Sequence, residues 1–137
     1  MDTKVAERAL TKFWADALGL TTDTNIFRGG IPVGKAEGVA VILGTEITGN
    51  DPAIKKYNVQ ILGKYDDRDK ALQLVEDVSG SLPCYEQALT VTGGSVNIRA
   101  MLKRGSGGTW QQSDDGTIKH YASFNLIAAF DDTSIVS

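Results

Sequence analysis

The chain has 137 residues, with 14 lysines and arginines against 17 aspartates and glutamates, so its formal net charge is −3. This length corresponds to one domain, and a hydrophobic fraction of 42% is enough to build a buried core. A mildly acidic chain without clustered Lys and Arg lacks the basic face of a dedicated nucleic-acid binder. Its acidity would repel phosphate, which suits a protein that lets DNA pass without gripping it.

Cysteine content and hydropathy indicate the cellular compartment in which the protein is expected. Cys84 is the only cysteine, so an internal disulfide is excluded, and we expect this thiol to be buried or half-buried. The N-terminus lacks the apolar core of a signal peptide, and no apolar run approaches the roughly 20 residues that span a membrane. We therefore expect a protein that is made and used in the cytoplasm, or in a particle assembled there.

Residues 2–18 are predicted to form a helix. Asp2 or Thr3 can cap its start, and Gly19 suits the position just past its end. Its apolar residues recur at helical spacing and predict one buried face. These residues are Leu10, Phe13, Trp14, Ala17 and Leu18.

Three strands and a second helix are predicted next. Residues 25–28 favour a short strand, the apolar run 38–44 a buried strand, and the alternating segment 57–65 a half-buried strand. The acidic segment 66–69 then opens a helix to about residue 81, because negative charge is favourable at a helix N-terminus. Its apolar positions are Ala71, Leu72, Leu74, Val75, Val78 and Leu82.

The C-terminal part is predicted to be β-structure. Residues 85–92 leave room for one short strand. In 95–103, Val96, Ile98, Ala100 and Leu102 alternate as the inward face, and 117–130 alternates again, with Tyr121, Ile127 and Ala129 on its outer side. The glycine-rich stretch 104–116 is expected to be a long flexible connection, and 131–137 a loose tail. The predicted fold is a single α+β domain over 1–137, with an antiparallel sheet and two helices packed on one face.

A near-match to a phosphate-binding loop occurs at residues 29–35. Lys35 is followed by Ala36, where the motif needs Ser or Thr to hold Mg²⁺. The motif should also run into a helix N-terminus, whereas a strand is predicted from residue 38. We therefore expect no binding of ATP or GTP.

Other catalytic and metal-binding patterns are also missing from the sequence. His120 is the only histidine, and it alternates with apolar residues, which indicates a core or interface position. The Asp114-Asp115-Gly116 segment is typical of a β-turn and lacks the spaced oxygen ligands of a calcium loop. We expect no catalytic residue, no metal site and no cofactor.

Three segments in the first 82 residues carry a resemblance to a known family. They are IFRGGIP, GVAVILGTEITGNDP and KKYNVQILGKYDDRDKALQLVEDVSGSL. Together with the N-terminal helix they resemble the tail terminator, or minor capsid, proteins of long-tailed bacteriophages. Arg28-Gly29 and Pro32 match the family's turn, residues 59–64 its second strand and residues 71–75 its helix. The resemblance covers roughly residues 5–82.

The resemblance implies a structural virion protein located at the head–tail junction. Such a protein forms a ring, usually a hexamer, at the head-proximal end of the tail, where it ends tail-tube growth and provides the head-docking surface. Its implied partners are itself, the tail-tube protein and a head-completion or connector protein, while DNA passes through without sequence-specific binding. From the residues themselves, we expect the subunit or tail interface to include Arg104, Trp110, Gln111, Tyr121 and Ile127. In this interpretation the 104–116 connection is an arm that becomes ordered on a neighbouring subunit or on the tail tube; the alternative is a loose hairpin tip with Trp110 packed on its own domain. The alternatives are another neck or head-completion protein, a host-encoded small binding module or a small enzyme.

Overall fold

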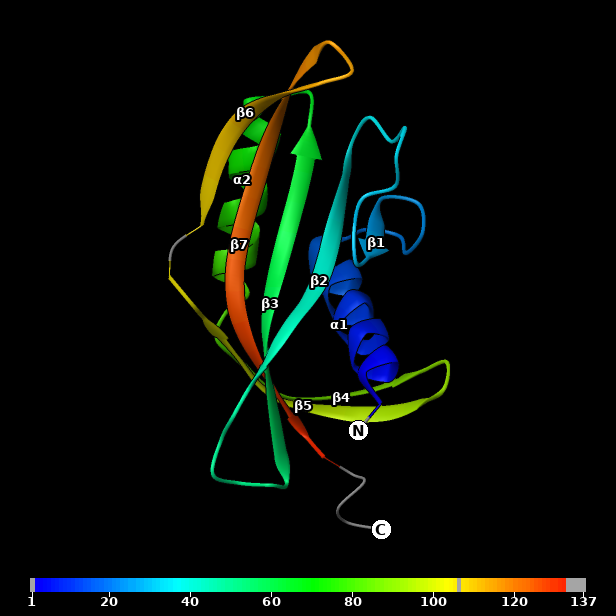
Figure 1. Ribbon diagram of the computed structural model, residues 1–137, viewed down its shortest axis with the longest axis vertical. Helices are drawn as coiled ribbons and strands as arrows, with labels where there is room; N and C mark the ends of the chain where they lie inside the picture. Colours follow the sequence, from blue (N-terminus) through cyan, green and yellow to red (C-terminus); the bar gives the residue numbers. More distant parts are fainter. Residues whose placement is uncertain (1, 106, 133–137) are drawn as a thin grey trace.

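The computed structural model describes residues 2–105 and 107–132, which form a sheet of seven strands curled around two helices (Figure 1). The elements in chain order are α1 (Thr3–Leu18), β1 (Ile26–Arg28), β2 (Gly38–Ile47), β3 (Ile54–Tyr65), α2 (Arg68–Gly80), β4 (Cys84–Val91), β5 (Gly94–Lys103), β6 (Gly108–Asp114) and β7 (Thr117–Asp131). Strand residues far outnumber helical ones. None of the helices among these residues is long and apolar enough to cross a membrane.

The predicted fold class, an antiparallel sheet with two helices on one face, is wrong. The sheet is mixed, because β1 pairs with β2 in parallel, and it curls into a half-barrel. The main path is β1-β2-β3-β7-β5-β4, and β6 pairs with β7 off this path. β7 is long enough to take two partners on one edge, β5 beside Leu126–Phe130 and β6 beside Thr117–Ser123.

The two helices lie inside the curl at different places. α1 packs against β1, β2, β4 and β5, whereas α2 packs against β3, β6 and β7. The cap predictions for α1 are confirmed: the Asp2 carboxylate accepts from Lys4 N–H, and Gly19 takes the left-handed conformation. α2 begins after Asp67, whose carboxylate accepts from the N–H of Asp69.

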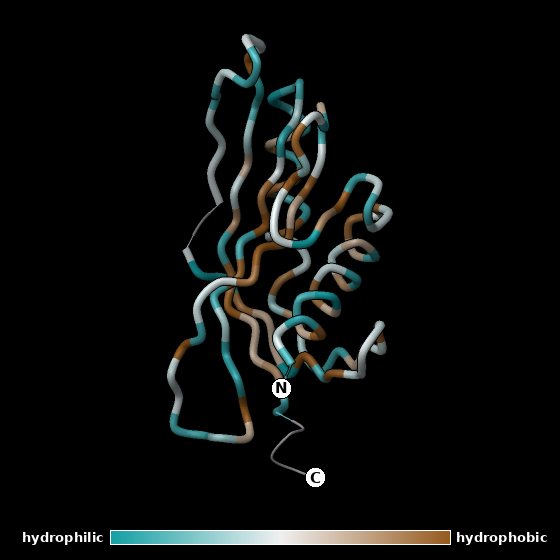
Figure 2. Tube along the Cα trace, turned by 45° about the vertical axis from the view of Figure 1, so that its right-hand side comes forward, coloured by the Kyte–Doolittle hydropathy of each residue, from teal (hydrophilic) through white to brown (hydrophobic). Residues whose placement is uncertain are grey.

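The core fills the space between the helices and the concave side of the sheet. Trp14 from α1, Ile61 from β3 and Phe130 from β7 are fully buried within it. Hydrophobic residues concentrate on the middle of the strands, and hydrophilic residues on several of the loops that project beyond them (Figure 2). The predicted buried face of α1 is partly wrong, because Ala17 is exposed while Val5, Ala6 and Ala9 are buried.

The predicted alternation of β5 fails at its second half. Its register with β7 shifts between Ile98 and Ala100, so the side chains after this irregularity change faces. Met101 is fully buried and Leu102 is 43% exposed, the reverse of the expectation. A β-bulge has this effect because one extra residue inverts the two-residue period of a strand.

The predicted flexible connection over 104–116 is also wrong for most of its length. Residues 108–114 form β6, which pairs with β7 from Gly108↔Ser123 to Asp114↔Thr117. At the end of the chain, Asp131 closes β7, and the Asp132 N–H donates to Ala53 O at 2.7 Å. Residues 133–137 of the predicted tail lie outside the described residues.

Candidate interaction surface on the outer face of the sheet

The outer face is the side of the sheet that points away from α1 and α2. Alternation along the paired strands defines it: Ile61 and Phe124 point into the core, while their neighbours Gln60 and Asn125 point outward. Both helices lie behind the sheet in Figure 1, so this face is not covered by any helix of the described chain. It is therefore a β-sheet surface that is open to a partner.

Apolar and aromatic side chains remain exposed on this face. Tyr85 on β4 is 58% exposed, Leu102 on β5 43% and Trp110 on β6 41%. Leu102 lies opposite Ile127 of β7. Trp110 lies opposite Tyr121, and their rings stack with centroids 5.5 Å apart and planes 12° apart. The Trp110 indole is thus held in place while much of its surface stays open to solvent.

The structure brings four of the five predicted interface residues to the outer face. Trp110, Tyr121 and Ile127 lie there by strand register, and Arg104 lies beside them, with its guanidinium bonded to the Asn58 side chain. Gln111 does not join them. It pairs with His120, whose other neighbour is Tyr65, so it points to the side of the sheet that holds α2.

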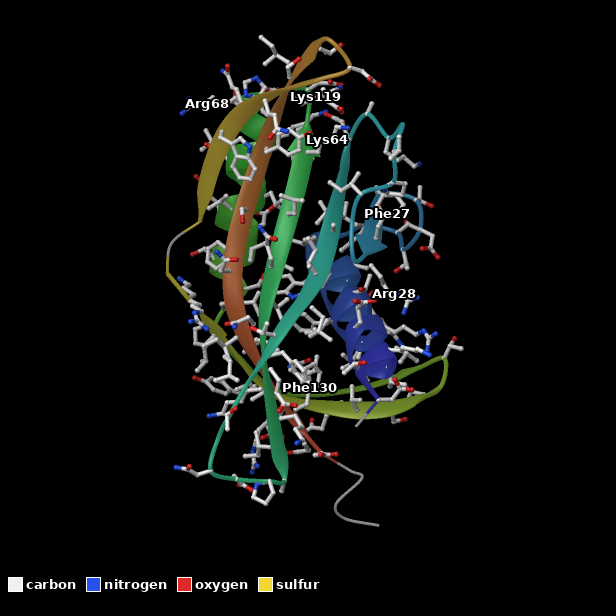
Figure 3. All side chains as sticks on the ribbon, viewed as in Figure 1. Phe27, Arg28, Lys64, Arg68, Lys119 and Phe130 are labelled. Atoms are coloured by element: carbon white, nitrogen blue, oxygen red, sulfur yellow. The ribbon has the colours of Figure 1, made fainter. Side chains whose placement is uncertain are left out.

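A hollow of about 410 Å³ lies at the upper end of the outer face. The loop of residues 31–36 forms one wall, the β6–β7 turn forms the other, and Leu62, Lys64 and Tyr121 lie between them. Lys64 and Lys119 project side by side at this end of the sheet (Figure 3). Both are buried, at 9% and 8% exposure, which is unusual for lysine.

A carboxylate balances the positive charge of each of these two buried lysines, Lys64 and Lys119. The Lys64 ammonium pairs with Asp114 and donates to Lys35 O at 3.0 Å, and the Lys119 ammonium pairs with Asp66. The hydrogen bond to Asp114 raises the pKa of Lys64, and the hydrogen bond from Lys119 lowers the pKa of Asp66. Both ion pairs tie the β6–β7 end to neighbouring segments, because Asp114 ends β6 and Asp66 follows β3.

The chemistry of this hollow is that of a structural site. A lysine acts as a nucleophile when its pKa is lowered and a neutral amine is present, whereas Lys64 is held in its protonated form. Within residues 2–105 and 107–132, no three His, Cys, Asp or Glu side chains are grouped to hold a metal ion. Lys64 is therefore present here as a paired ammonium ion and not as a neutral amine.

A second hollow of about 340 Å³ lies lower on the same face. It is lined by Asn58, Gln60, Arg104 and Asn125 with apolar neighbours. The Gln60 side chain donates to the Ser123 hydroxyl at 2.9 Å, and the Arg104 guanidinium donates to the Asn58 side chain, so polar side chains are linked across strands here. This part of the face combines polar donors with the nearby Leu102 and Ile127.

Sequence reasoning did not identify Lys64, Lys119, Leu102 or Tyr85 as members of this surface. The sequence could have indicated Lys119, because residues two apart on a strand share a face and Tyr121 was predicted to point outward. Leu102 was hidden by the register shift in β5, which cannot be read from the alternation of residues 96–102.

The segment that nearly matches a phosphate-binding loop, residues 29–35, contributes residues 31–35 to the wall of the upper hollow. The strand β2 begins at Gly38, as predicted, so the loop does not lead into a helix. The Lys35 ammonium donates to Thr24 O at 3.2 Å and lies 5.6 Å from the centre of the Phe27 ring. Lys35 therefore already has contacts within its own loop region.

Comparison with known proteins adds no relative to this description. A scan against protein-family models finds no match, and a search of curated proteins finds none either. Function therefore has to be argued from the residues of this chain and from their arrangement.

Proposed function

We propose that this chain is a structural virion protein that assembles with copies of itself into the ring at the head-proximal end of a phage tail. The observation that carries the proposal is the outer face of the sheet. It keeps Tyr85, Leu102 and Trp110 exposed on regular strands, while the concave side already holds the core. Three of the large hydrophobic side chains that are exposed among the described residues lie on this face, which favours a protein-interaction surface there.

The anchoring of Trp110 supports an interface role. Its stack on Tyr121 fixes the indole before any partner arrives, so binding costs little side-chain entropy. Tryptophan and arginine are over-represented among residues that dominate interface energies, and Arg104 lies on the same face. The face is thus preorganised for a protein partner.

The resemblance over residues 5–82 gives the proposal its biological setting. This range runs from α1 to the end of α2, and it includes the turn after β1 where Gly29 has a positive φ of 75°. In this setting the ring has six copies, it ends growth of the tail tube, and it presents one end to a head-completion protein. The net charge of −3 suits a channel wall along which DNA slides.

The test is assembly of the purified chain, alone and in the presence of a phage tail-tube protein. We expect analytical ultracentrifugation to show a single large species, and negative-stain images to show rings with a central hole, either alone or on tube ends. Tubes grown without the chain should be longer and should lack a terminal ring.

A monomer that stays monomeric at high concentration and leaves tube length unchanged would contradict the proposal. A ring that binds the head connector but leaves tube growth unaffected would point to another neck protein. Saturable binding of a small metabolite by a monomer would instead support a host-encoded binding module.

A further inference from the structure

A basic hollow lies on the flank formed by α1 and the β4–β5 hairpin. Its volume is about 580 Å³, and its lining includes Arg8, Lys12 and Arg28 with one carboxylate, Asp23. Three cations against one anion make this lining positive, although the whole chain has a net charge of −3. The flank is therefore electrostatically distinct from the rest of the molecule.

Two of these cations are held in place without being neutralised by their partners. Arg8 donates to Thr92 O at 3.0 Å, and Lys12 donates to Thr90 O at 3.1 Å. Backbone carbonyls are neutral, so these bonds orient the cations and leave their charge. Arg28 is different, because its guanidinium lies 3.7 Å from the Glu7 carboxylate.

The positive charges follow the helix in a regular stripe. Lys4, Arg8 and Lys12 are spaced by four residues, so they share one side of α1 at intervals of about 6 Å. Lys4 and Lys12 are exposed, and Arg8 is half-buried. A partner with negative groups about 12 Å apart can meet both ends of this stripe.

The exposed side of α2 has the complementary pattern. Asp69, Gln73 and Asp77 are spaced by four residues and are all exposed, with Glu76 beside them. The two aspartates are about 12 Å apart along the helix axis, which matches the separation of Lys4 and Lys12. Gln73 lies between the two aspartates and donates to the Asp77 carboxylate at 2.8 Å. Because Gln73 is neutral, it would not repel the Arg8 guanidinium opposite it.

The cations of α2 do not cancel this pattern. Lys70 pairs with Glu37 at 3.2 Å, so its charge is compensated within the subunit. Arg68 lies at the start of the helix, before the stripe of Asp69, Gln73 and Asp77. The acidic groups are exposed in the first turn of α2, at Asp69, and toward its end, at Glu76 and Asp77.

The two stripes lie on different helices behind the sheet, and Gln73 and Asp77 of the acidic stripe border a hollow that also includes Leu18 at the end of α1. In Figure 1, α1 lies behind β1 and β2, and α2 lies behind β6 and β7 at the other side. Figure 3 shows the same separation through Arg28 beside α1 and Arg68 at the start of α2. The ion pairs formed by the described residues do not join the two stripes within one subunit; Arg28 pairs with Glu7 and Lys70 with Glu37.

We propose that the acidic side of α2 in one copy docks against the basic stripe and hollow of α1 in the next copy. This inference rests on the proposed ring and names a further contact between its subunits, in addition to the outer face of the sheet. A contact between two different flanks is heterologous: each copy that uses its α2 still offers its α1, so the contact repeats until the ring closes.

The charges favour a second copy over DNA as the occupant. A DNA-binding stripe would continue over a broad basic face, whereas Glu7 and Asp23 border this one. The matched spacing on α2 of the same chain supplies a partner of opposite charge and equal length. DNA binding is kept as an outcome of the test.

The experiment uses two charge-reversed variants of the full chain. The first, Arg8→Glu with Lys12→Glu, makes both stripes acidic. The second, Asp69→Lys with Asp77→Lys, makes both stripes basic. We expect each variant alone to lose the ring in sedimentation and in negative-stain images, because every flank contact becomes repulsive.

An equimolar mixture of the two variants gives the sharpest result. The reversed α1 of the first variant fits the reversed α2 of the second, and the two unaltered stripes also fit each other. We therefore expect the mixture to regain rings in which the variants alternate, which requires an even number of subunits. Recovery on mixing also shows that both variants are folded.

Two further measurements complete the design. The control Lys55→Glu reverses a positive charge on β3 at a position paired with the inward-facing Phe130, outside both stripes and the outer face, and should keep the ring. Raising NaCl from about 0.05 to about 0.5 M should weaken wild-type assembly, because salt screens exposed charges.

The possible outcomes separate the two proposals. If the wild type forms rings and both reversed variants do so equally, the flank contact is wrong while the proposed function stands. If the first variant keeps the ring but loses binding to a DNA duplex, the stripe contacts DNA and the inference is also overturned. If the wild type forms no ring with or without tail tubes, both proposals fail.

Discussion

The Trp110 indole lies flat on the Tyr121 ring across the β6–β7 pair, with ring centroids 5.5 Å apart. This relationship joins a polar edge strand to the longest strand of the sheet. It also presents an aromatic surface on a face that no helix of the described chain covers. Folding alone does not require Trp110 to stay 41% exposed, which is why we assign it to an interface.

Replacing Trp110 with Ala should separate folding from assembly. Loss of a stacked pair and of a half-exposed ring should lower the free energy of unfolding by about 1 kcal/mol, so the domain should remain folded. Assembly should be lost or reduced by at least about tenfold, since a central aromatic anchor often contributes 2 kcal/mol or more, roughly thirtyfold in affinity. Thermal melts and sedimentation of the same sample measure the two effects.

Gln111→Ala is the matched control for Trp110, because Gln111 is exposed on the neighbouring position but points to the opposite side of the sheet. It should leave both stability and assembly unchanged. If Trp110→Ala unfolds the domain, or if assembly is untouched by it, the interface role of Trp110 is wrong.

Gly63→Ala should destabilise the packing of α2 on β3. A Cβ atom at this position would lie 2.4 Å from Leu74 Cδ2 and 2.9 Å from Tyr65 Cε2. Leu74 is buried, so it has little room to move, and overpacking of this kind costs about 1–3 kcal/mol. Urea unfolding followed by circular dichroism should show the loss, while Gly30→Ala, which meets no atom within 4 Å, should show almost none.

The sequence predicted those elements whose hydrophobic pattern and end signals agree. Asp2 and Gly19 bound α1 as expected, and the acidic start of α2 follows its cap residue, Asp67. The alternation of residues 117–130 correctly indicated a strand much longer than average. In each case local chemistry and tertiary burial favour the same structure.

The missed features depend on pairing, which leaves little trace in a single strand. β6 has no apolar alternation, since it is held by its ladder with β7 and by the contact of Trp110, so its glycine-rich approach looked like a flexible loop. The parallel pairing of β1 involves three residues and is decided by the path of the loop that follows. The hollow at Lys64 also arises from segments that meet only in the fold, residues 31–36 and 114–119.

Tyr65 should make the protein sensitive to alkaline pH. Burial raises the pKa of Tyr65 to about 12, from an ordinary value of 10.0. The native state therefore keeps the phenol proton at a pH where the unfolded chain has lost it. The stabilisation is complete below pH 10 and is lost as the pH rises from about 10 to about 12.

The expected loss from Tyr65 is about 1–2 kcal/mol. The difference of two between the native and the ordinary pKa of Tyr65 corresponds to at most about 2.7 kcal/mol. The partial exposure of the ring reduces this free energy through solvent screening. Urea midpoints measured from pH 8 to 12 should fall less steeply in Tyr65→Phe than in the wild type. The exposed Tyr85→Phe should keep the wild-type slope, and equal slopes in all three proteins would contradict the assignment.

The loop that ends in Lys35 should not bind nucleotides. The Lys35 ammonium lies over the Phe27 ring and donates to Thr24 O, so its contacts stabilise the loop and do not leave it directed at a phosphate. The next residue is Ala36, which supplies no hydroxyl for Mg²⁺, and the chain then enters β2 instead of a helix. Calorimetry with millimolar ATP or GTP and Mg²⁺ should show no saturable heat.

Lys35→Ala should lower the free energy of unfolding by about 0.5–1 kcal/mol through the lost cation–π contact, while Lys56→Ala, which changes an exposed lysine on β3, should not. Saturable nucleotide binding that disappears in Lys35→Ala would mean that the loop is a phosphate site after all.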